Sequence, residues 1–512
     1  MAVQWAFEVA CERTPSRLAV VQGSIRWSFG DLWEHASKLA RVFTEKGLVV
    51  GDRVLVGLRN TPENVAVFFA TQMNGLVYVP INYRVHASSV QYFWQYSGAS
   101  LGILESDLIE GLLQADPFWV GAQAADNLWI GDSRLWERTH GTDRLFIQPQ
   151  VDDGNLSMIL FTSGTTGKPK GVPLTHGNVL ARTLGPSLNW DCPHDAQERV
   201  LGIMPLYHTI GLQACLLYGI LQNHTYYPVA QFSPASTLKL IESERITHVF
   251  GTPTHLYALV TEPTLGQIDT SSLTHILYGG APMSPYVIQG CAERLCSRIT
   301  YVYGNTETYN ALYHREAART LEQSVGGIYH RVRVVEIGGT PDQLVDRGHE
   351  GELIIDVRSP ESFKGYWNLP EKTGEKVKEG WYFSGDSCRW EGENTYRVTG
   401  RVDDMIISGG ENIQPVTVEN ALLGHPDVLD VAVAGIPDEH WGQKVKAYVV
   451  TRNAGLAVSD LDQWVKTRST LDPYMRPRSY QFVADIPRNP SGKILRQSLN
   501  TLDQNSLGEA LS

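Results

Sequence analysis

The sequence contains little cysteine, a modest share of charged residues and no excess of basic ones. Charged side chains make up 19% of the 512 residues, and the formal net charge is −12. Binding along nucleic acid requires a basic surface, so this charge argues against a nucleic-acid partner, although anionic ligands could bind in locally positive pockets. The six cysteines form no Cys-x-x-Cys pair. Neither a zinc site nor a redox motif is indicated, and reduced, buried thiols in a cytoplasmic protein are expected.

Long apolar segments and targeting signals are also missing. The best candidate for a membrane span, residues 212–221, is far shorter than the roughly 20 residues that a bilayer requires, and it predicts a buried helix. The first residues lack a basic start followed by an apolar run, so no secretory signal is expected. At 512 residues the chain exceeds one ordinary hydrophobic core, and we expect a large domain with a smaller one.

Short runs rich in β-branched residues alternate with helical patterns through the first 300 residues. Residues 53–57 precede a helical pattern over 63–74, and 77–80 form another strand pattern. The later strand patterns are 201–204, 248–250 and 276–278, followed by helical patterns from 211, over 252–260 and over 285–296. Such alternation predicts parallel, doubly wound sheets with helices on both faces.

The pattern changes twice in the second half of the chain. From about Ser324, strand patterns at 331–337, 352–357 and 395–398 are separated by glycine-rich turns, which predicts an antiparallel β-barrel or sandwich region. Near Asp403 the composition changes again. The alternating elements beyond it are 416–423, 428–435, 445–451 and 461–467. We therefore predict an α/β protein with a large N-terminal domain over 1–402, built from two doubly wound sheets and a β-barrel region, and a small α+β C-terminal domain over 403–512.

A loop after an apolar strand, within residues 156–171, has the composition of a phosphate-binding loop. Its hydroxyls, glycines and lysines are Ser163, Thr165, Thr166, Gly164, Gly167, Gly171, Lys168 and Lys170. Glycines let backbone N–H groups approach phosphate oxygens, while hydroxyls add donors and lysines add positive charge. Only two residues separate Gly164 from Gly167, and Pro169 follows Lys168, so the loop does not match the Walker pattern of P-loop NTPases.

This loop resembles the signature of the acyl-adenylate-forming superfamily, which includes acyl-CoA synthetases, peptide-synthetase adenylation domains and firefly luciferase. Further segments match motifs of that family in its order, between about residues 20 and 500. They are Tyr-Gly-Asn-Thr-Glu at 303–307, Tyr-Phe-Ser-Gly-Asp at 382–386, Gly-Arg-Val-Asp-Asp at 400–404 and Pro-Arg-Asn-Pro-Ser-Gly-Lys-Ile-Leu-Arg at 487–496. The resemblance implies an enzyme that uses ATP and Mg²⁺ to convert a carboxylic acid to an acyl-adenylate, and then transfers the acyl group to coenzyme A.

The resemblance also implies individual roles. Lys493 would bridge the carboxylate and the α-phosphate, since two anions meet in that step and the site must supply positive charge. Glu307 and Thr162 would belong to the Mg²⁺ site, which suits one or two carboxylates together with substrate phosphates. His208 would stand beside the carboxylate of the acid, in a role other than proton transfer. Tyr303 would stack on adenine. The implied ATP- and AMP-binding residues are Thr162, Ser163, Gly164, Thr165, Thr166, Gly167, Lys170, Gly280, Tyr303, Gly304, Asn305, Thr306, Asp386 and Arg401.

Members of this family rotate the small domain between their two half-reactions, and Asp403 matches the hinge. After rotation, a loop at 408–410 would line a tunnel for the thiol of coenzyme A. The implied CoA-binding residues are Arg84, Ser408, Gly409, Gly410, Trp441, Tyr474 and Arg476. The small domain is therefore expected to be mobile.

Several segments resemble aryl-CoA ligases, 4-chlorobenzoate–CoA ligases among them. These segments are 204–211, 251–255, 310–313, 401–413 and 441–443. The implied acid pocket is lined by His208, Thr209, Ile210, Phe250, Gly279, Gly280, Val302, Tyr309 and Asn310. Such a largely apolar pocket with a few polar groups suits an aromatic or bulky hydrophobic acid.

Other interpretations stay open. An adenylating enzyme that loads a carrier protein would usually anchor an α-amine with an aspartate, whereas this chain has Tyr207 and His208 at that position. A luciferase-like oxygenase is another alternative, and an assay for light emission with a luciferin would distinguish it from a ligase. A non-catalytic nucleotide-binding regulator is opposed by the joint presence of Lys493, Glu307 and Asp386. The chain departs from common family patterns at 326–330, where Gly-Lys-Pro is usual, and at Ile407, where many relatives carry lysine. A homodimer is also left open.

Overall fold

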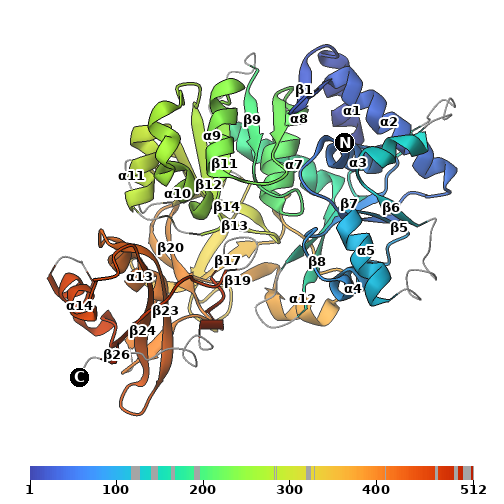
Figure 1. The fold of residues 1–512 in the computed structure, drawn as a ribbon. Helices are drawn as coiled ribbons and strands as arrows, with labels where there is room; N and C mark the ends of the chain where they lie inside the picture. The colour runs from blue at the N-terminus through green and yellow to red at the C-terminus, as the bar shows by residue number, and fades with distance from the viewer. Residues whose placement is uncertain are drawn as a thin grey trace.

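The protein, in this computed structural model, is built on three β-sheets with helices packed around them (Figure 1). The structure describes residues 1–116, 127–139, 148–162, 168–189, 197–281, 283, 285–318, 324–327, 329–409, 411–467, 471–488, 494–496, 498–499 and 509–510. Within these residues, no helix has the length and apolar character needed to cross a membrane.

The first sheet carries helices on both faces. Its strand order is β6 (Leu128–Ile130), β5 (Leu101–Leu104), β3 (Arg53–Gly57), β4 (Val77–Pro80), β7 (Leu156–Thr162) and β8 (Lys170–Thr175), parallel except for the β7–β8 pair. Val54 and Val56 pack against α1 (Val3–Arg13), α2 (Phe29–Glu45) and α3 (Pro62–Met73). Leu55 packs on the other face, against α4 (Ala87–Ser97) and α5 (Ser106–Ala115). This alternation follows from the two-residue period of a strand.

The second sheet begins as a parallel sheet and continues as an antiparallel one. Its order is β2 (Ile25–Ser28), β1 (Leu18–Gln22), β10 (Thr225–Pro228), β9 (Arg199–Gly202), β11 (His248–Gly251), β12 (His275–Gly279), β13 (Ile299–Asn305), β14 (Tyr309–His314), β15 (Ser324–Gly326), β20 (Thr395–Arg401), β19 (Trp381–Gly392), β17 (Glu350–Asp356) and β16 (Val332–Val335), with β18 (Val377–Lys378) paired to β19. Neighbouring strands from β1 to β13 are parallel, whereas β2 at one end and the strands from β14 onward are antiparallel to their neighbours. The predicted barrel region therefore continues the second sheet.

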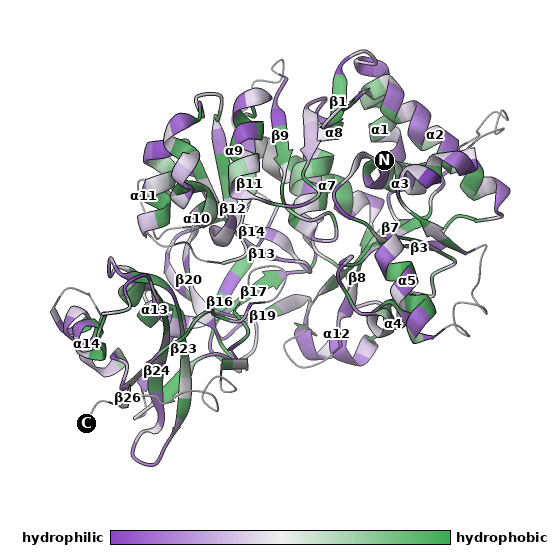
Figure 2. Ribbon diagram, viewed as in Figure 1, coloured by the Kyte–Doolittle hydropathy of each residue, from purple (hydrophilic) through white to green (hydrophobic). Residues whose placement is uncertain are grey.

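Two helical layers cover the parallel part of this sheet. One face packs against α9 (Pro234–Ser243), α10 (Pro253–Thr261) and α11 (Pro285–Arg294). The other packs against α7 (His176–Asn189), α8 (Tyr218–Leu221) and the π-helix η2 (Ile210–Leu217). Figure 2 shows α2 and α5 alternating hydrophilic and hydrophobic positions, as amphipathic helices over a core do. The remaining short helices are η1 (Ser133–Thr139), η3 (Pro263–Gln267), α12 (Pro370–Lys376) and η4 (Pro473–Met475).

The C-terminal residues form a separate sheet with its own hydrophobic core. Its order is β22 (Glu411–Ile413), β21 (Ile406–Ser408), β24 (Gly442–Thr451), β25 (Ser479–Phe482) and β26 (Glu509–Ala510), with β23 (Val428–Asp438) also paired to β24. Helices α13 (Pro415–Leu423) and α14 (Val458–Thr467) pack on it. In Figure 1 this unit lies beside the antiparallel strands, and α13 contacts β20.

Candidate active site

A cavity of about 770 Å³ lies between the second sheet and the C-terminal sheet. On one side its lining comes from the ends of β13 and β20, the turn after β12, and the start of α10. On the other side it comes from α13, β23 and the described residues Asp485, Ile486, Arg488, Ile494 and Arg496. Since β11, β12 and β13 are parallel, their carboxyl ends meet at this edge, where ligands of open α/β sheets usually bind.

Tyr303, Asp386 and Arg401 form a polar cluster in this cavity. Asp386 and Arg401 are opposite each other on β19 and β20. The Tyr303 hydroxyl donates to Asp386 Oδ2, and Arg401 Nη1 donates to Asp386 Oδ1 at 2.9 Å. Burial and the adjacent carboxylate raise the pKa of Tyr303 far above its usual value, so its hydroxyl keeps its proton. Asp386 lines the cavity, and each of its carboxylate oxygens has a second lone pair that can accept a further hydrogen bond.

The backbone next to this cluster depends on glycine. Gly280 adopts φ +85°, and it lines the cavity. A Cβ at Gly304 would lie 1.8 Å from the carbonyl oxygen of Tyr309, so no larger residue fits there. Tyr309 itself has φ +60°, which is rare for a tyrosine and is typical of strained backbone at functional sites.

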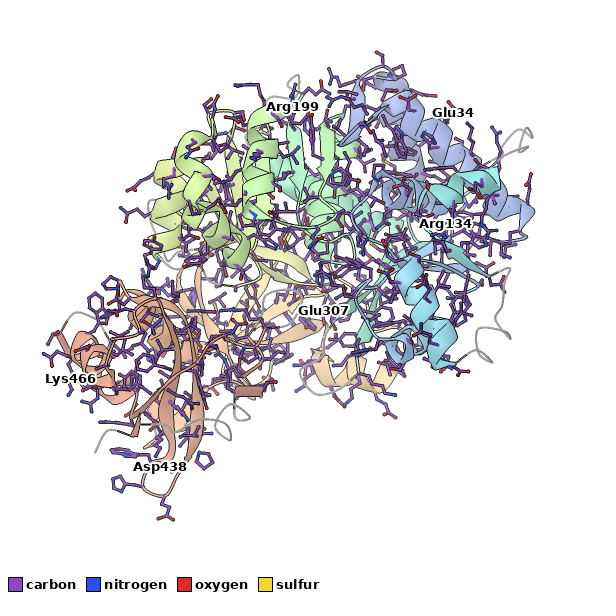
Figure 3. The ribbon with its side chains drawn as sticks, in the orientation of Figure 1. Glu34, Arg134, Arg199, Glu307, Asp438 and Lys466 are labelled. Atoms are coloured by element: carbon purple, nitrogen blue, oxygen red, sulfur yellow. The ribbon has the colours of Figure 1, made fainter. Side chains whose placement is uncertain are left out.

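Glu307 lies in the turn between β13 and β14, near the centre of the molecule (Figure 3). Its Oε1 accepts a hydrogen bond of 2.7 Å from the Tyr366 hydroxyl. The Lys170 ammonium stands 5.0 Å from the centre of the Tyr366 ring. Lys170 is paired with Thr162 across the β7–β8 hairpin, so Thr162 and Lys170 stand at the two ends of the predicted phosphate loop. The hairpin and Tyr366 thereby bring a cation and a carboxylate to one region.

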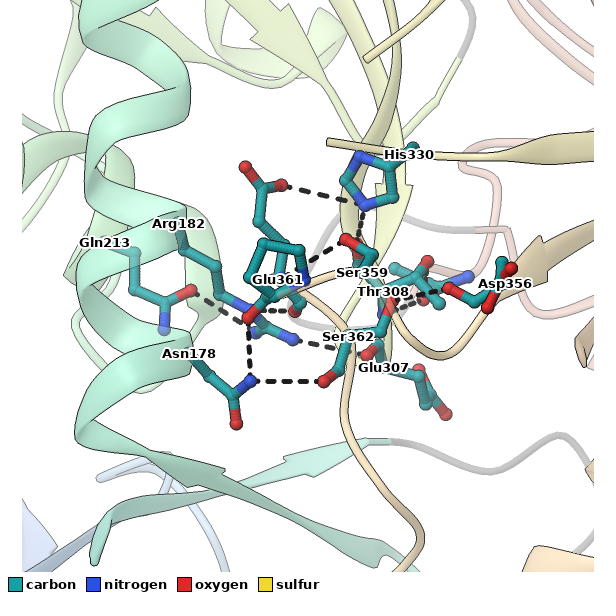
Figure 4. Close-up of polar contacts among 12 residues, drawn as sticks. Asn178, Arg182, Gln213, Glu307, Thr308, His330, Asp356, Ser359, Glu361 and Ser362 are labelled. Atoms are coloured by element: carbon teal, nitrogen blue, oxygen red, sulfur yellow. Dashed lines mark hydrogen bonds and ion pairs between the residues drawn. The ribbon is translucent and has the colours of Figure 1, made fainter. Parts of the chain in front are cut away.

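A fully buried arginine, Arg182, holds the turn that carries Glu307. Its Nη2 donates to the carbonyl oxygens of Thr306 at 3.1 Å and Glu307 at 3.2 Å, and its Nε donates to the carbonyl oxygen of Glu361 at 2.6 Å (Figure 4). Burial lowers the pKa of Arg182 only to about 10, so it stays charged. Sequence reasoning missed this residue. The available signal was a cation among the apolar residues Val179, Leu180 and Leu184.

The predicted acid-pocket residues lie on β11, β12, β13, β14 and the segment before η2. Phe250, Val302, Tyr309 and Asn310 are almost fully buried, and a Cβ at Gly279 would lie 2.7 Å from the Val302 carbonyl oxygen. Ile210 is the first residue of η2, and Thr209 precedes it. The Thr209 hydroxyl donates a hydrogen bond of 2.5 Å to Oε1 of Gln213, which lies on η2. Burial lowers the pKa of His208 to about 4, so its ring is neutral at pH 7. That neutral state suits a positioning role rather than proton transfer.

The C-terminal side of the cavity is held by ion pairs. Arg488 donates to both carboxylate oxygens of Asp430, at 2.8 and 2.9 Å. Arg496 pairs with Glu419 on α13 and with Asp404. Arg488 and Ile494 form a short antiparallel bridge, and both line the cavity. Lys493 itself and the predicted loop residues Ser163, Gly164, Thr165, Thr166 and Gly167 lie outside the described residues.

Comparison with known proteins agrees with this architecture. Residues 7–367 match the model of the AMP-binding enzyme family, and residues 417–493 match that of the AMP-binding enzyme C-terminal domain. The chain belongs to the AMP-binding enzyme family. It is similar to a feruloyl-CoA synthase from an Amycolatopsis species (33% identical, 94% of this chain and 95% of that protein) and to a 4-chlorobenzoate–CoA ligase from an Arthrobacter species (30%, 96% and 94%).

The chain is also similar to one further relative and to a solved structure. A fatty acid–[acyl-carrier-protein] ligase from Streptomyces coeruleorubidus is 31% identical, covering 95% of this chain and 94% of that protein. The solved structure of ATP-bound MatB from Rhodopseudomonas palustris superimposes with a TM-score of 0.87 at 24% identity over 99% of each chain. This AMP-binding enzyme thus has the fold of that structure.

The predicted CoA-binding residues of this AMP-binding enzyme fall into separate groups. Ser408 and Gly409 lie beside Trp441: the Gly409 N–H donates to the Trp441 carbonyl oxygen at 2.9 Å. Arg476 is paired at 3.1 Å with the buried Asp462, while Tyr474 is exposed. Arg84 is far along the chain from the other predicted CoA-binding residues, and its guanidinium stacks on the Tyr83 ring. Of the described residues in this set, none lines the cavity, and Gly410 is not among the described residues.

Proposed function

We propose that this AMP-binding enzyme is an ATP-dependent acid–CoA ligase acting on an aromatic or bulky hydrophobic carboxylic acid. The carboxylate would attack the α-phosphate of ATP, the bond to pyrophosphate would break, and the thiol of CoA would then displace AMP from the acyl-adenylate. The observation that carries the proposal is the cavity in which Tyr303, Asp386 and Arg401 face the segment next to Lys493. Relatives named as CoA ligases support the choice of acceptor.

The residues have distinct parts in this scheme. Asp386 and Arg401 would bind the ribose hydroxyls, because a carboxylate with free lone pairs accepts them and the arginine fixes its orientation. Tyr303 would present its ring to adenine. Thr162 and Lys170, at the two ends of the hairpin loop, would hold phosphate oxygens. Lys493 would bring its ammonium group to the point where the two anions meet.

The oxygen ligands at Glu307 fit a magnesium ion. Mg²⁺ prefers one or two carboxylates together with substrate phosphates and waters. Glu307 would be its protein carboxylate, with the Thr162 hydroxyl beside it, and the ion would neutralise phosphate charge. Tyr366 and Arg182 keep this carboxylate and its turn in one position before the ion arrives.

Replacing Lys493 tests the proposal. Lys493→Ala should lower acid-dependent pyrophosphate release by about 10²- to 10³-fold or more, because a preorganised cation opposite a developing charge is lost. Thioester formation from a pre-made acyl-adenylate should be affected far less, since in the proposed scheme the small domain has rotated before that step and Lys493 no longer stands at the α-phosphate. Both rates are measured on the same preparation.

The exposed Lys38, which pairs with Glu34, gives a matched control as Lys38→Ala. That variant should keep both rates. An equal loss of both half-reactions in Lys493→Ala would contradict the assigned role. Offering CoA and a phosphopantetheinylated carrier protein side by side decides between the two thiol acceptors, and transfer to the carrier alone would replace the CoA ligase by the carrier-loading alternative.

A further inference from the structure

Four buried polar atoms near the predicted acid pocket have no hydrogen-bond partner in the described part of the chain. They are the Tyr309 hydroxyl, Asn310 Nδ2, Glu361 Oε2 and His330 Nδ1. Tyr309 is 0% exposed and Asn310 3%, and the side chains of Glu361 and His330 are 2% and 1% exposed. Buried polar groups in native proteins nearly always have partners, so the atoms left without one here are available to a bound molecule.

The atoms of Tyr309, Glu361 and His330 belong to one neighbourhood, in which Tyr309 interacts electrostatically with Glu361 and Arg182. Glu361 Oε1 and the Tyr313 hydroxyl both border Gly185, since a Cβ there would lie 3.0 and 3.1 Å from them. A Cβ at Gly327 would lie 2.9 Å from His330 Nδ1 and 3.2 Å from the Tyr313 ring. His330 Nε2 stands 3.7 Å from Glu361 Oε2, as Figure 4 shows. Helix α7, strand β14 and two loops therefore meet around this group.

Tyr309 connects the group to the nucleotide cavity. Its carbonyl oxygen fills the space beside Gly304, which lines the cavity, while its ring lies 5.4 Å from the Arg182 guanidinium. Arg182 Nη1 also donates to Gln213 Oε1 at 3.4 Å, the atom that accepts from Thr209 next to His208. The group is thus bounded by both segments that were predicted to line the acid pocket.

Packing alone does not explain a carboxylic acid at this position. Arg182 directs its Nε to the main-chain oxygen of Glu361, and its two Nη atoms donate to other oxygens, so the guanidinium leaves the Glu361 side chain without a hydrogen bond. Burial raises the pKa of Glu361 to about 8, so the carboxyl carries a proton at neutral pH and can both donate and accept. The Tyr309 hydroxyl can do the same.

We propose that Tyr309 and Glu361 form a polar subsite of the acid pocket, and that the cognate acid carries a hydroxyl group on the part that enters it. A hydroxyl donates one hydrogen bond and accepts others, which matches the donors and acceptors left over here. An unsubstituted ring or alkyl chain would leave them all without partners. The inference rests on the proposed function, because it concerns the acid that the ligase activates.

Matched pairs of acids test the subsite. Acid-dependent pyrophosphate release is measured for benzoate against 4-hydroxybenzoate, cinnamate against 4-hydroxycinnamate, and hexadecanoate against 16-hydroxyhexadecanoate. We expect kcat/KM to favour the hydroxylated member of at least one pair by about tenfold or more, because a site built to bind a hydroxyl rejects the analogue that lacks it. The pair that shows the preference identifies an aromatic or an aliphatic acid.

The two failures are distinguishable. Release with none of the acids would count against the proposed function. Release with equal kcat/KM for both members of every accepted pair would overturn the subsite and leave the ligase proposal standing.

Tyr309→Phe and Glu361→Leu test the residues themselves. Each should shrink the preference for the hydroxylated acid severalfold, whereas Glu361→Gln, which keeps hydrogen-bonding atoms, should retain more of it. Without ligand, Tyr309→Phe should melt at or above the temperature of the parent, because its hydroxyl has no bond to lose. The melting temperature of Tyr309→Phe therefore tests the assignment even if Glu361→Leu fails to fold. A parental preference in both Tyr309→Phe and Glu361→Leu would overturn the assignment.

Discussion

At the scale of single residues, Tyr366 joins two charged groups that the proposed chemistry needs together. Its hydroxyl donates to the Glu307 carboxylate and its ring faces the Lys170 ammonium. The side chain touches no substrate in the proposed scheme, so we regard it as a positioning residue. Groups that hydrogen-bond to a metal ligand typically change metal affinity by about 10- to 100-fold when they are removed.

Tyr366→Phe separates the two contacts, because it removes the hydroxyl and keeps the ring beside Lys170. We expect the Mg²⁺ concentration for half-maximal pyrophosphate release to rise by about tenfold, since Glu307 loses the bond that orients it. The KM for the acid should stay close to its parental value. A titration of the initial rate with Mg²⁺ at saturating ATP measures both.

Tyr92 offers a matched control for this experiment. Its ring stands 5.2 Å from the Lys168 ammonium, but its hydroxyl donates to the Pro169 carbonyl oxygen instead of a carboxylate. Tyr92→Phe should therefore leave the Mg²⁺ dependence as it is. If both variants shift the Mg²⁺ dependence equally, the effect reflects packing of the loop, and Tyr366 loses its assigned part.

At the scale of elements, the four residues between β20 and β21 connect the N-terminal sheets to the C-terminal one. Asp403 lies there, with its carboxylate largely exposed and 3.7 Å from Arg401. In this arrangement Ile494, which follows Lys493 in the chain, lines the cavity. Ser408, Gly409 and Trp441 do not line it. In the proposed scheme the thioester step uses the opposite arrangement, and these few residues would then change their backbone angles.

Asp403→Pro should restrict that change, because proline fixes φ near −65°. We expect acid-dependent pyrophosphate release to persist and thioester formation to fall by at least about tenfold. Asp403→Ala controls for the loss of the weak, exposed ion pair with Arg401, and it should retain both half-reactions. Full thioester formation in Asp403→Pro would remove Asp403 as the proposed hinge.

Local patterns predicted several elements well and others poorly. Strands β3 and β4 have the predicted bounds, because strongly apolar runs are bordered by turns. Strand β9 was predicted two residues late: its pairing with β10 and β11 ends by Gly202, where the Tyr226 ring occupies the space that a side chain would need. The apolar helix near Gly211 is a π-helix, which periodicity alone does not distinguish from an α-helix.

The candidate site shows the same limit. Asp386 and Arg401 could be predicted because each sits in a motif, and the structure pairs them directly. Arg182 and Tyr366 could not, since their partners are 124 and 59 residues away along the chain and only the tertiary fold brings them together. Chemistry that depends on local spacing is visible in the sequence, whereas the contacts that orient it are not.

At the scale of the whole molecule, a set of buried neutral histidines links stability to pH. Burial lowers the pKa of His176, His208, His224, His255 and His330 to about 4 and that of His275 to about 3. In the unfolded chain each would titrate near 6.5. Between these values the unfolded state binds more protons than the folded one, so the free energy of unfolding decreases as the pH falls.

The carboxylates modify this trend without reversing it. The raised pKa of Glu361 acts in the opposite direction between about pH 4.5 and 8, and burial raises the pKa of Glu352 as well, but these are two groups against six. The pKa of Glu198 is lowered to about 2 by its hydrogen bond with His248, so its contribution is lost only below about pH 4.5. The net expectation is a steep loss of stability from about pH 6.5 down to 4, by up to about 1.4 kcal/mol per pH unit for each histidine.

Thermal melts between pH 7.5 and 4.5 measure this dependence. A single substitution then measures how much of it one histidine contributes. His275 contacts the Thr300 hydroxyl at 2.9 Å inside the core, so His275→Gln removes one titrating ring while it keeps a polar group there. The variant should melt lower than the parent at pH 7.5, but its melting temperature should fall less between pH 6.5 and 4.5. The same exchange at the exposed His86 should reproduce the parental slope. If the melting temperature of the parent does not change across this range, the histidines are not buried in their neutral form. If His275→Gln has the same pH dependence as the parent, the His275 ring does not contribute to the acid sensitivity.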